Sequence, residues 1–326
     1  MKLKGLRFID LFAGIGGFHT ALSSFGAECV FASEWDKHAS QTYLANYQIM
    51  PAGDITSITE NQIPAHDILC AGFPCQAFSI SGKRKGFADT RGTLFFDIAR
   101  IAQYHQPKIL FLENVKNFIK HDDGKTLATV VSTLEEIGYC VFHKILNASD
   151  FGLPQNRERI YIVCFRKDLL VNEFTFPVSS NQKVALQDFL EHNPNDVKTI
   201  IRNDIFIHKT FTPDIDVLGK EILPNRPIQI GIVNKGGQGE RIYHPLGHAI
   251  TLSAYGGGIG AKTGLYKIGN NIRKLSPREC ARIQGYADDF KIISSTAQAY
   301  KQFGNTVAVN VLKAILTEIE KTEITR

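Results

Sequence analysis

The sequence predicts an α/β protein with a mostly parallel sheet and a second, smaller domain that is mostly β. Over residues 1–165, short β-like runs alternate with segments of helical apolar spacing. Alternation of this kind is typical of parallel sheets with helices on both faces. From about residue 191 to 271 the pattern changes to short, irregular pieces punctuated by proline and glycine, which favours a separate domain.

Six strands are expected in the first region, at residues 6–12, 28–34, 66–72, 108–114, 140–148 and 159–166. Between them, GFHTALSSF and TLFFDIARIAQYH have the apolar spacing of helices. After residue 272, LSPRECARIQGY and TVAVNVLKAILTEIEK predict two more helices. The chain is therefore expected to have three parts, residues 1–190, 191–271 and 272–326, of which the last returns to the first.

Composition argues against a membrane protein. Of the 326 residues, 44% are hydrophobic and 21% are charged, as is usual in globular proteins. No apolar run reaches about 18 residues, so no transmembrane helix is expected. The segment MKLKGLRFIDLFAG lacks the long apolar stretch and the small-residue cleavage site of a signal peptide. We therefore expect a cytoplasmic protein.

The cysteines predict neither a metal site nor disulfides. The six cysteines are scattered, without a C-x-x-C pair, and a reducing compartment disfavours disulfides. Cys29, Cys140 and Cys164 lie in strand-like apolar runs, where a buried packing role is expected. Cys75 differs, because it follows Pro74 in GFPCQAFSISG, at the end of a predicted strand. It is either a packing residue or a nucleophile on a stiffened turn.

Positive charge is concentrated in one part of the chain. The formal net charge is +5, and residues 226–274 hold seven lysines or arginines against one acid, Glu240. The same stretch contains the glycine-rich runs GIVNKGGQGER and SAYGGGIGAKTG. Such loops are either solvated surface or a site for a polyanion such as nucleic acid, which needs positive charge on a closely approaching backbone.

A glycine turn joins the first predicted strand to a helix in DLFAGIGGF, residues 10–18. Glycines there let a ligand approach the backbone closely. Glu34 follows Gly14 by twenty residues, which is the spacing of an acid that binds the ribose of an adenosine. The G-x-G-G spacing departs from G-x-G-x-x-G, so NAD is the weaker choice. Trp35 offers a face for adenine, and Asp54 is either a further ligand or an ordinary helix cap.

An ordered set of motifs resembles the cytosine-5 DNA methyltransferases. They are DLFAGIGGF, GFPCQAFS, ENV (113–115), LPQNRERIY (153–161), RKLSPRECARIQGY and QFGNTVAVNV, in the family's order and over almost the whole chain. The resemblance implies a Rossmann-like S-adenosylmethionine-dependent methyltransferase fold. It makes 1–190 the catalytic and cofactor-binding domain and 191–271 the target-recognition domain. Residues 272–326 become a hinge and a C-terminal helix that returns to the catalytic domain.

The chemistry explains why this family needs a cysteine. Carbon 5 of cytosine is too weak a nucleophile until a thiolate adds at carbon 6 and converts the ring to an enamine. By the resemblance, Cys75 is that nucleophile. No residue in the motifs is an obvious base for the carbon 5 proton, so an ordered water is expected in that role.

Three further side chains are expected to act on the cytosine. The resemblance implies that Glu113 hydrogen-bonds N3 and the exocyclic amine, and a raised pKa is expected because this role needs a protonated carboxyl group. Arg157 and Arg159 alternate along a predicted strand, so both should point to the site. One or both would bind the cytosine O2 and orient Glu113, and the alternative is a pair of surface arginines on an edge strand.

The resemblance also implies the cofactor and its ligands. The methyl donor would be S-adenosylmethionine and the product S-adenosylhomocysteine, with no metal. The adenine would lie by Phe12, the ribose by Glu34, and the methionine end by the glycine turn and Asn305. The full set of expected cofactor-binding residues is Phe12, Gly14, Gly16, Glu34, Trp35, Asp54, Pro74 and Asn305.

Double-stranded DNA is the partner that the resemblance implies. The target base must leave the duplex to be reached, so base flipping is expected. Residues 77–92 look like the loop that closes on DNA, with Lys83–Lys85 meeting phosphates. Ser81 and Gln238 would fill the space of the flipped cytosine, and Arg241 would read guanine. The expected DNA-binding residues are Ser79, Ser81, Lys83, Arg84, Gln238, Arg241, Thr251 and Tyr255, and the implied target is GCGC with the inner cytosine methylated.

Other readings remain open from the sequence. An RNA cytosine-5 methyltransferase could use the same fold, although the long glycine-rich segment favours DNA. A catalytically silent DNA-binding protein is disfavoured by the intact catalytic set, and a nicotinamide enzyme is a distant third. We expect a DNA-associated monomer in a bacterial cytoplasm, with no membrane contact. A restriction endonuclease would share its restriction-modification system, linked in function but not needed for physical assembly.

Overall fold

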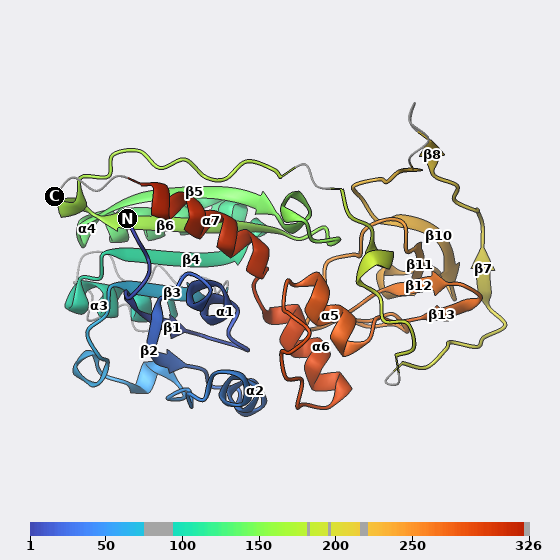
Figure 1. The fold of residues 1–326 in the computed structure, drawn as a ribbon, viewed down its shortest axis with the longest axis horizontal. Coiled ribbons are helices and arrows are strands. Elements are labelled where there is room, and N and C mark those ends of the chain that lie inside the picture. Colours follow the sequence, from blue (N-terminus) through green and yellow to red (C-terminus); the bar gives the residue numbers. More distant parts are fainter. Residues whose placement is uncertain (75–93, 181–182, 195–196, 216–220, 323–326) are drawn as a thin grey trace. The chain divides into compact units, whose positions relative to one another are not determined.

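The computed structural model describes residues 1–326 apart from 75–93, 181–182, 195–196, 216–220 and 323–326 (Figure 1). The chain forms two compact units. The first comprises Met1–Leu146, Glu158–Pro177 and Leu312–Arg326, and the second Asn147–Arg157 and Val178–Val311. Residues 178–190 and 272–311 thus group with the second unit, whereas the sequence-based division at 190 and 271 assigned them elsewhere.

The first unit is built on a six-stranded sheet with the order β2-β1-β3-β4-β6-β5. Strand β1 pairs in parallel with β2 and β3, and β3 with β4, whereas β4 and β6 are antiparallel. The sheet is therefore mixed, and each expected strand is present within about two residues of its predicted bounds. The strands are β1 Arg7–Leu11, β2 Glu28–Ser33, β3 Ile68–Gly72, β4 Ile109–Val115, β5 Tyr139–Asn147 and β6 Glu158–Arg166.

Helices cover both faces of this sheet, as the alternating pattern predicted. Helices α3 (Leu94–His105) and α4 (Lys125–Glu136) pack on the face that carries Leu69 and Leu110. On the opposite face, α1 (Gly17–Ser23) places the Phe18 ring edge-on against Phe111, 5.1 Å between centroids. Each fully buried side chain of this size contributes about 1.5–3 kcal/mol, so the two layers fix the sheet on which the site is built.

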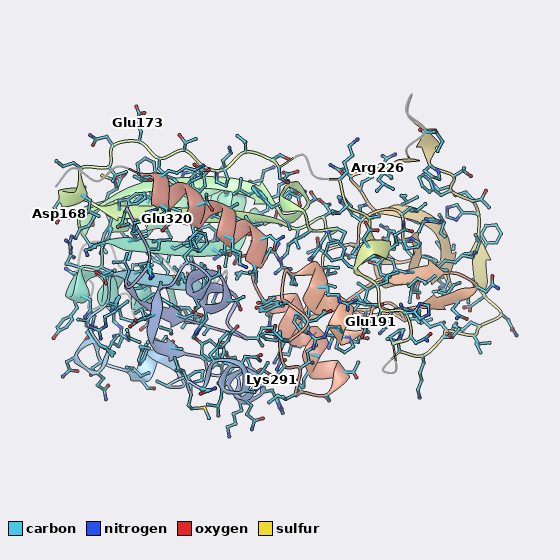
Figure 2. All side chains as sticks on the ribbon, in the orientation of Figure 1. Asp168, Glu173, Glu191, Arg226, Lys291 and Glu320 are labelled. Carbon is cyan, nitrogen blue, oxygen red and sulfur yellow. The ribbon has the colours of Figure 1, made fainter. Side chains whose placement is uncertain are left out.

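Two further helices belong wholly or mostly to the first unit. Helix α2 (Lys37–Tyr47) begins at Asp36, whose carboxylate accepts from the backbone N–H groups of His38 and Ala39, as an N-cap should. Most of α7 (Val309–Lys321) belongs to the first unit, and Figure 2 labels its Glu320. The Glu320 carboxylate accepts from the Leu3 N–H at 3.0 Å. Short 3₁₀ turns are η1 Ile55–Ser57, η2 Glu60–Gln62, η4 Lys116–Gly124, η5 Ala148–Phe151 and η6 Lys167–Leu169.

The second unit holds the mostly β region that the sequence predicted. Its five-stranded sheet has the order β13-β12-β11-β10-β7, beside a two-stranded pair, β8-β9. Ile230, Val233, Ile242 and Leu265 form its apolar core. The strands are β7 Ile205–Ile207, β8 Asp214–Ile215, β9 Glu221–Ile222, β10 Ile228–Val233, β11 Arg241–His244, β12 Leu265–Ile268 and β13 Asn271–Arg273, with 3₁₀ turns η7 Leu186–Phe189 and η8 Gln238–Glu240.

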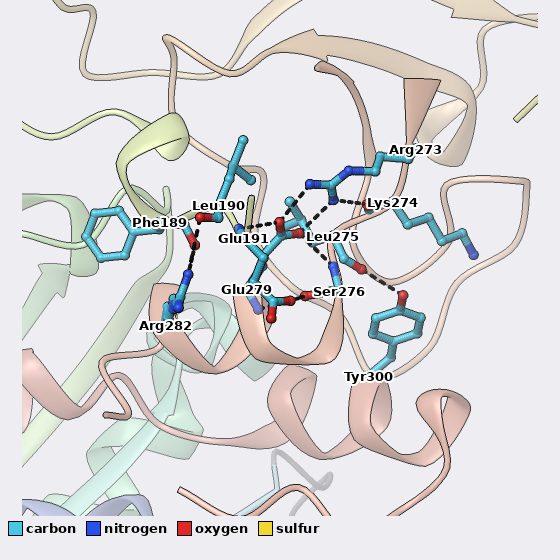
Figure 3. A network of polar contacts seen from close by, with 10 residues as sticks. All are labelled: Phe189, Leu190, Glu191, Arg273, Lys274, Leu275, Ser276, Glu279, Arg282 and Tyr300. Atoms are coloured by element: carbon cyan, nitrogen blue, oxygen red, sulfur yellow. Dashed lines mark hydrogen bonds and ion pairs between the residues drawn. The ribbon is translucent and has the colours of Figure 1, made fainter. Parts of the chain in front are cut away.

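Helices α5 (Pro277–Ile283) and α6 (Thr296–Asn305) complete this unit. Helix α5 begins with a capping box, in which the Ser276 hydroxyl accepts from the Glu279 N–H and the Glu279 carboxylate from the Ser276 N–H. The fully buried Glu279 also accepts from both terminal nitrogens of Arg273 at 2.7 Å and from the Glu191 N–H at 2.9 Å (Figure 3). This buried carboxylate therefore joins the chain at residue 191 to the stretch 273–279.

Candidate active site

The site begins where β3 and β4 end side by side. Gly72 pairs with Glu113 in the parallel register of these strands. The buried Asn114 side chain donates from Nδ2 to the Phe73 carbonyl at 2.9 Å. The chain that leaves β3 is thus tied to β4 next to Glu113. Cys75 comes two residues after Phe73 and lies outside the described residues.

Glu113 and Arg159 form a largely buried ion pair. Arg159 Nε lies 3.2 Å from Glu113 Oε1, and their side chains are 14% and 9% exposed. The register of β4 and β6 accounts for the pairing, because Val115 lies opposite Arg159. Arg159 Nη1 also donates to the Glu158 carbonyl at 2.8 Å. The guanidinium therefore has two polar partners, the Glu113 carboxylate and a main-chain carbonyl.

Arg157 takes a different position from the one expected. Strand β6 begins at Glu158, one residue after Arg157. Arg157 belongs to the second unit and is 2% exposed. Its guanidinium donates to the carbonyls of Leu252 (3.2 Å), Gly304 (3.2 Å) and Thr306 (2.6 Å). The Arg157 side chain is thus bound to three main-chain carbonyls of the second unit.

The glycine turn after β1 has the conformation that the sequence led us to expect. Gly14 and Gly16 have positive φ angles of 55° and 84°, which favour glycine. A Cβ at Gly14 would point into open space, so a ligand can approach the backbone there. The Glu34 carboxylate accepts from the N–H groups of Gly14 and Asp36, both at 2.8 Å. Burial raises the pKa of Glu34, and these backbone donors oppose that shift.

Tyr47, which the sequence analysis did not single out, holds the other side of the turn. Its hydroxyl donates to the Gly16 carbonyl at 2.8 Å and lies 2.6 Å from the Thr20 hydroxyl. The Tyr47 ring stacks on His19 at 3.9 Å. A Cβ on Gly16 would lie 2.2 Å from this ring, so the tyrosine and the glycine fit only together. The sequence carries no specific signal for this role, because a single tyrosine is common in any segment.

Asp10 lies in strand β1, which precedes the glycine turn. It is 1% exposed, and burial raises its pKa well above the ordinary value. The nearby Glu34 carboxylate raises it further, while the His19 backbone lowers it. Cys29, Cys70 and Tyr43 surround it, and its charge would raise their pKa values in turn. A neutral carboxyl group is the form that this setting favours.

The other expected cofactor residues of the first unit are more exposed. The Trp35 ring is 78% exposed and leaves a face free for a flat ligand. Asp54 caps η1 by accepting from the Thr56 N–H at 3.0 Å, which is the alternative that the sequence left open. Phe12 packs partly against the core at a positive φ of 55°. Pro74 is exposed, and Asn305 lies in the second unit at the end of α6.

The two glycine-rich loops of the second unit pack backbone against backbone. The Gly260 N–H donates to the Gly239 carbonyl at 2.7 Å, and a Cβ on Gly239 would lie 2.1 Å from the Gly257 carbonyl oxygen. Their glycines are therefore needed for close approach. Exposed side chains flank this contact, namely Gln238, Arg241, Thr251 and Tyr255. The other expected DNA-binding residues, Ser79, Ser81, Lys83 and Arg84, lie outside the part of the chain that the structure describes.

Comparison with known proteins identifies the family. The profile of the family described as C-5 cytosine-specific DNA methylase matches residues 6–321. The chain belongs to this family. It is thus a DNA (cytosine-5) methyltransferase, as the motifs predicted. The family uses S-adenosylmethionine, and the open glycine turn with the Glu34 carboxylate beside it fits an adenosyl group.

Several relatives resemble the methyltransferase over nearly its full length. The type II methyltransferase M.HhaI of Haemophilus parahaemolyticus is 55% identical over 324 residues, 98% of this chain and 95% of that protein. M.HpaII of Haemophilus parainfluenzae is 47% identical over 94% of this chain and 87% of its own length. Among solved structures, a putative DNA modification methyltransferase of an Escherichia coli prophage has a TM-score of 0.72 at 20% identity, covering 97% of this chain and 99% of its own.

The structure of the Schizosaccharomyces pombe Dnmt2 methyltransferase gives a TM-score of 0.70 at 20% identity, covering 96% of this chain and 98% of its own. At this identity the likeness establishes the fold alone, and the expected methyltransferase fold is confirmed. Within the described ranges, no group of three or more His, Cys, Asp or Glu side chains is placed to hold a metal ion. No helix there is long and apolar enough to cross a bilayer.

Proposed function

We propose that the methyltransferase modifies carbon 5 of one cytosine in a specific duplex sequence through a covalent adduct with Cys75. The observation that carries this proposal is the Arg159–Glu113 pair at 3.2 Å, beside the strand end from which the chain continues to Cys75. A carboxyl group held by a guanidinium can act on a ring nitrogen and amine while a thiolate attacks the adjacent carbon. Hydrolytic and redox sites do not need this combination.

In the proposed reaction, each bond formed at the cytosine ring is matched by one that breaks. The Cys75 thiolate adds to carbon 6, and the electron pair pushed into the ring is stabilised by a hydrogen bond from Glu113 to N3. Arg159 holds Glu113 and binds the cytosine O2. When bound, S-adenosylmethionine would supply an electrophilic methyl group on a sulfonium. Carbon 5 would form the new bond to this methyl group, and the sulfur would keep the electron pair of the broken bond in S-adenosylhomocysteine. An ordered water then takes the proton from carbon 5, and the thiolate is expelled as the ring regains its double bond.

The cofactor is assigned to the glycine turn. Glu34 would bind the ribose, since its carboxylate is already fixed by Gly14 and Asp36. The exposed face of Trp35 and the side chain of Phe12 would contact the adenine, with Asp54 and Pro74 nearby. Gly16 would face the methionine part, and Asn305 its far end.

DNA recognition is assigned to the segment that follows Cys75 and to exposed residues of the second unit. Arg241 offers a bidentate contact to guanine, and Gln238 and Ser81 would fill the vacated space in the duplex. Thr251 and Tyr255 would meet bases or backbone nearby, and Ser79, Lys83 and Arg84 the phosphates. The proposed target is GCGC with the inner cytosine methylated.

The biological setting is proposed from the type II relatives. We expect a monomer that works on DNA in a bacterial cytoplasm, as the modification half of a restriction-modification system. A cognate endonuclease would recognise the same sequence without binding the methyltransferase.

Two measurements on the full-length protein test the proposal. Duplex DNA carrying 5-fluorocytosine at the target should trap a covalent complex with the wild type, because fluorine cannot leave as a proton does. The Cys75→Ser variant should form none and transfer no methyl group, while Cys140→Ser should behave as the wild type. Bisulfite sequencing of DNA from expressing cells reads the target directly. Normal transfer by Cys75→Ser, methylation of tRNA in place of duplex DNA, or a site other than GCGC would each reject its part of the proposal.

A further inference from the structure

The Arg157 guanidinium is the meeting point of two distant stretches of the second unit. It is 2% exposed and lies within hydrogen-bond distance of carbonyls of Leu252, Gly304 and Thr306. A buried charge of this kind is costly unless it is well paired. The hydrogen bonds from Arg157 to these main-chain carbonyls offset the cost of burying its charge. They also hold in place the backbone that carries the carbonyls.

One of these stretches is the end of α6, residues 304–306. The last carbonyls of a helix have no partner inside it and carry partial negative charge. Arg157 Nη2 takes two of them, Gly304 at 3.2 Å and Thr306 at 2.6 Å. Asn305, which lies between them and is exposed, is the residue proposed for the methionine end of the cofactor.

The other stretch is 251–255, which carries Thr251 and Tyr255. The Leu252 carbonyl accepts from Arg157 Nη1 at 3.2 Å, and the Leu252 N–H donates to the buried Gln155 side chain at 3.0 Å. The Thr251 hydroxyl donates to the Asn156 carbonyl. Residues 155–157 therefore hold this stretch on both edges of its backbone.

The two stretches also touch each other. A Cβ on Gly304 would lie 2.3 Å from the Ala254 N and 2.4 Å from the Ser253 carbonyl carbon. No side chain can separate α6 from 253–254, so a shift of one backbone must be accommodated by the other. Arg157 spans this contact, with donors on each side.

We propose that Arg157 is a positioning residue that fixes the cofactor-binding end of α6 and the DNA-reading stretch 251–255 in one arrangement, rather than a residue that touches the cytosine. The inference rests on the proposed roles of Asn305, Thr251 and Tyr255. Loss of the guanidinium weakens the binding of both ligands. The chemical step is left intact, because Glu113 and Arg159 form their own pair in the first unit.

The test uses Arg157→Lys, with Arg157→Met as a second variant. An ammonium is a point charge and cannot serve three carbonyls in the planar arrangement of a guanidinium. We expect the dissociation constants for S-adenosylhomocysteine and for a cognate duplex each to rise about 5- to 30-fold, since one or two hydrogen bonds are lost. The single-turnover rate at saturating cofactor and duplex should stay within about threefold of the wild type.

Arg273→Lys is the matched control. Arg273 is another buried arginine of the same unit, and its partner is Glu279. It should lower the melting temperature while leaving both dissociation constants unchanged. Where Arg157→Met fails to fold, Arg157→Lys carries the test, because its ammonium still satisfies part of the carbonyl set.

The outcomes separate the possible roles. A single-turnover rate lowered about 100-fold or more with unchanged affinities would make Arg157 catalytic and overturn the inference. A lower melting temperature with unchanged affinities, as in the control, would leave it a purely stabilising residue and also overturn it. A wild type that neither binds S-adenosylhomocysteine nor methylates DNA would instead reject the proposed function itself.

Discussion

Arg159 Nε lies 3.2 Å from Glu113 Oε1, and the two side chains reach each other across the antiparallel pairing of β4 and β6. The pair is largely buried, where an ion pair is screened far less than on the surface. Its neighbour Glu158 points elsewhere and pairs with Lys116 at 2.7 Å in an exposed setting. The adjacent residues Glu158 and Arg159 thus form one exposed and one buried ion pair. Variants of Glu113 and Glu158 can test this contrast directly.

Replacement of Glu113 by glutamine should lower kcat about 10²- to 10⁴-fold, the range typical of a positioned acid or base. The carboxyl group can transfer a proton toward N3, whereas a glutamine amide has no proton that it can transfer. Steady-state kinetics on duplex DNA measures the change. Glu158→Gln is the matched control and should retain full activity, because its exposed ion pair contributes little. Equal loss in both variants would point to damage of the strand rather than to chemistry.

Tyr47→Phe should weaken the binding of S-adenosylhomocysteine about fivefold. The change removes the hydroxyl that bonds the Gly16 carbonyl, a contact worth about 1 kcal/mol, and leaves the ring on His19 in place. Isothermal titration calorimetry gives the dissociation constant. Tyr104→Phe, an exposed tyrosine of α3, should leave it unchanged. An unaltered affinity in Tyr47→Phe would mean that the turn keeps its shape without this bond.

Asp10→Asn should become more stable relative to the wild type as the pH rises. Burial raises the pKa of Asp10 well above its ordinary 3.8, so above pH 3.8 the unfolded chain loses a proton that the folded chain retains. The wild type then loses about 1.4 kcal/mol per pH unit until the folded pKa is passed, and asparagine, which mimics the neutral acid, loses nothing.

Urea unfolding of both proteins at pH 5, 6 and 7 measures this difference. Burial lowers the pKa of His19 to about 4, so this histidine costs stability as the pH falls below about 6.5. That contribution is common to both proteins and cancels in the comparison. A gap in unfolding free energy that is constant over the three pH values would contradict the raised pKa of Asp10.

Arg273→Met should destabilise the second unit by about 3–5 kcal/mol, because it leaves the fully buried Glu279 carboxylate without its guanidinium. The same carboxylate also holds the Glu191 N–H, so the segment before it should loosen too (Figure 3). Thermal unfolding and hydrogen exchange at Glu191 measure both effects. Arg202→Met, which breaks an exposed pair with Asp204, should leave the free energy of unfolding close to that of the wild type.

Much of the fold follows from local patterns. The short β-like runs predicted every strand of the main sheet, and the motif order predicted the family that the comparisons confirm. The direction of β6 did not follow, because strand periodicity is the same in parallel and antiparallel pairs. The sequence placed Glu113 at the end of a predicted strand, and the pairing of that strand with β3 sets it opposite Gly72.

The sequence by itself determined the family and the strands of the main sheet, since these follow from neighbouring residues and from motif order. The tertiary structure decided where long side chains go. Asp54 caps a turn, Tyr47 holds Gly16, and Arg157 binds carbonyls about 95 and 150 residues away in the chain. The physical reason is that a buried donor must find a hydrogen-bond acceptor. Only the folded chain shows which carbonyls at the end of a distant helix are left to accept.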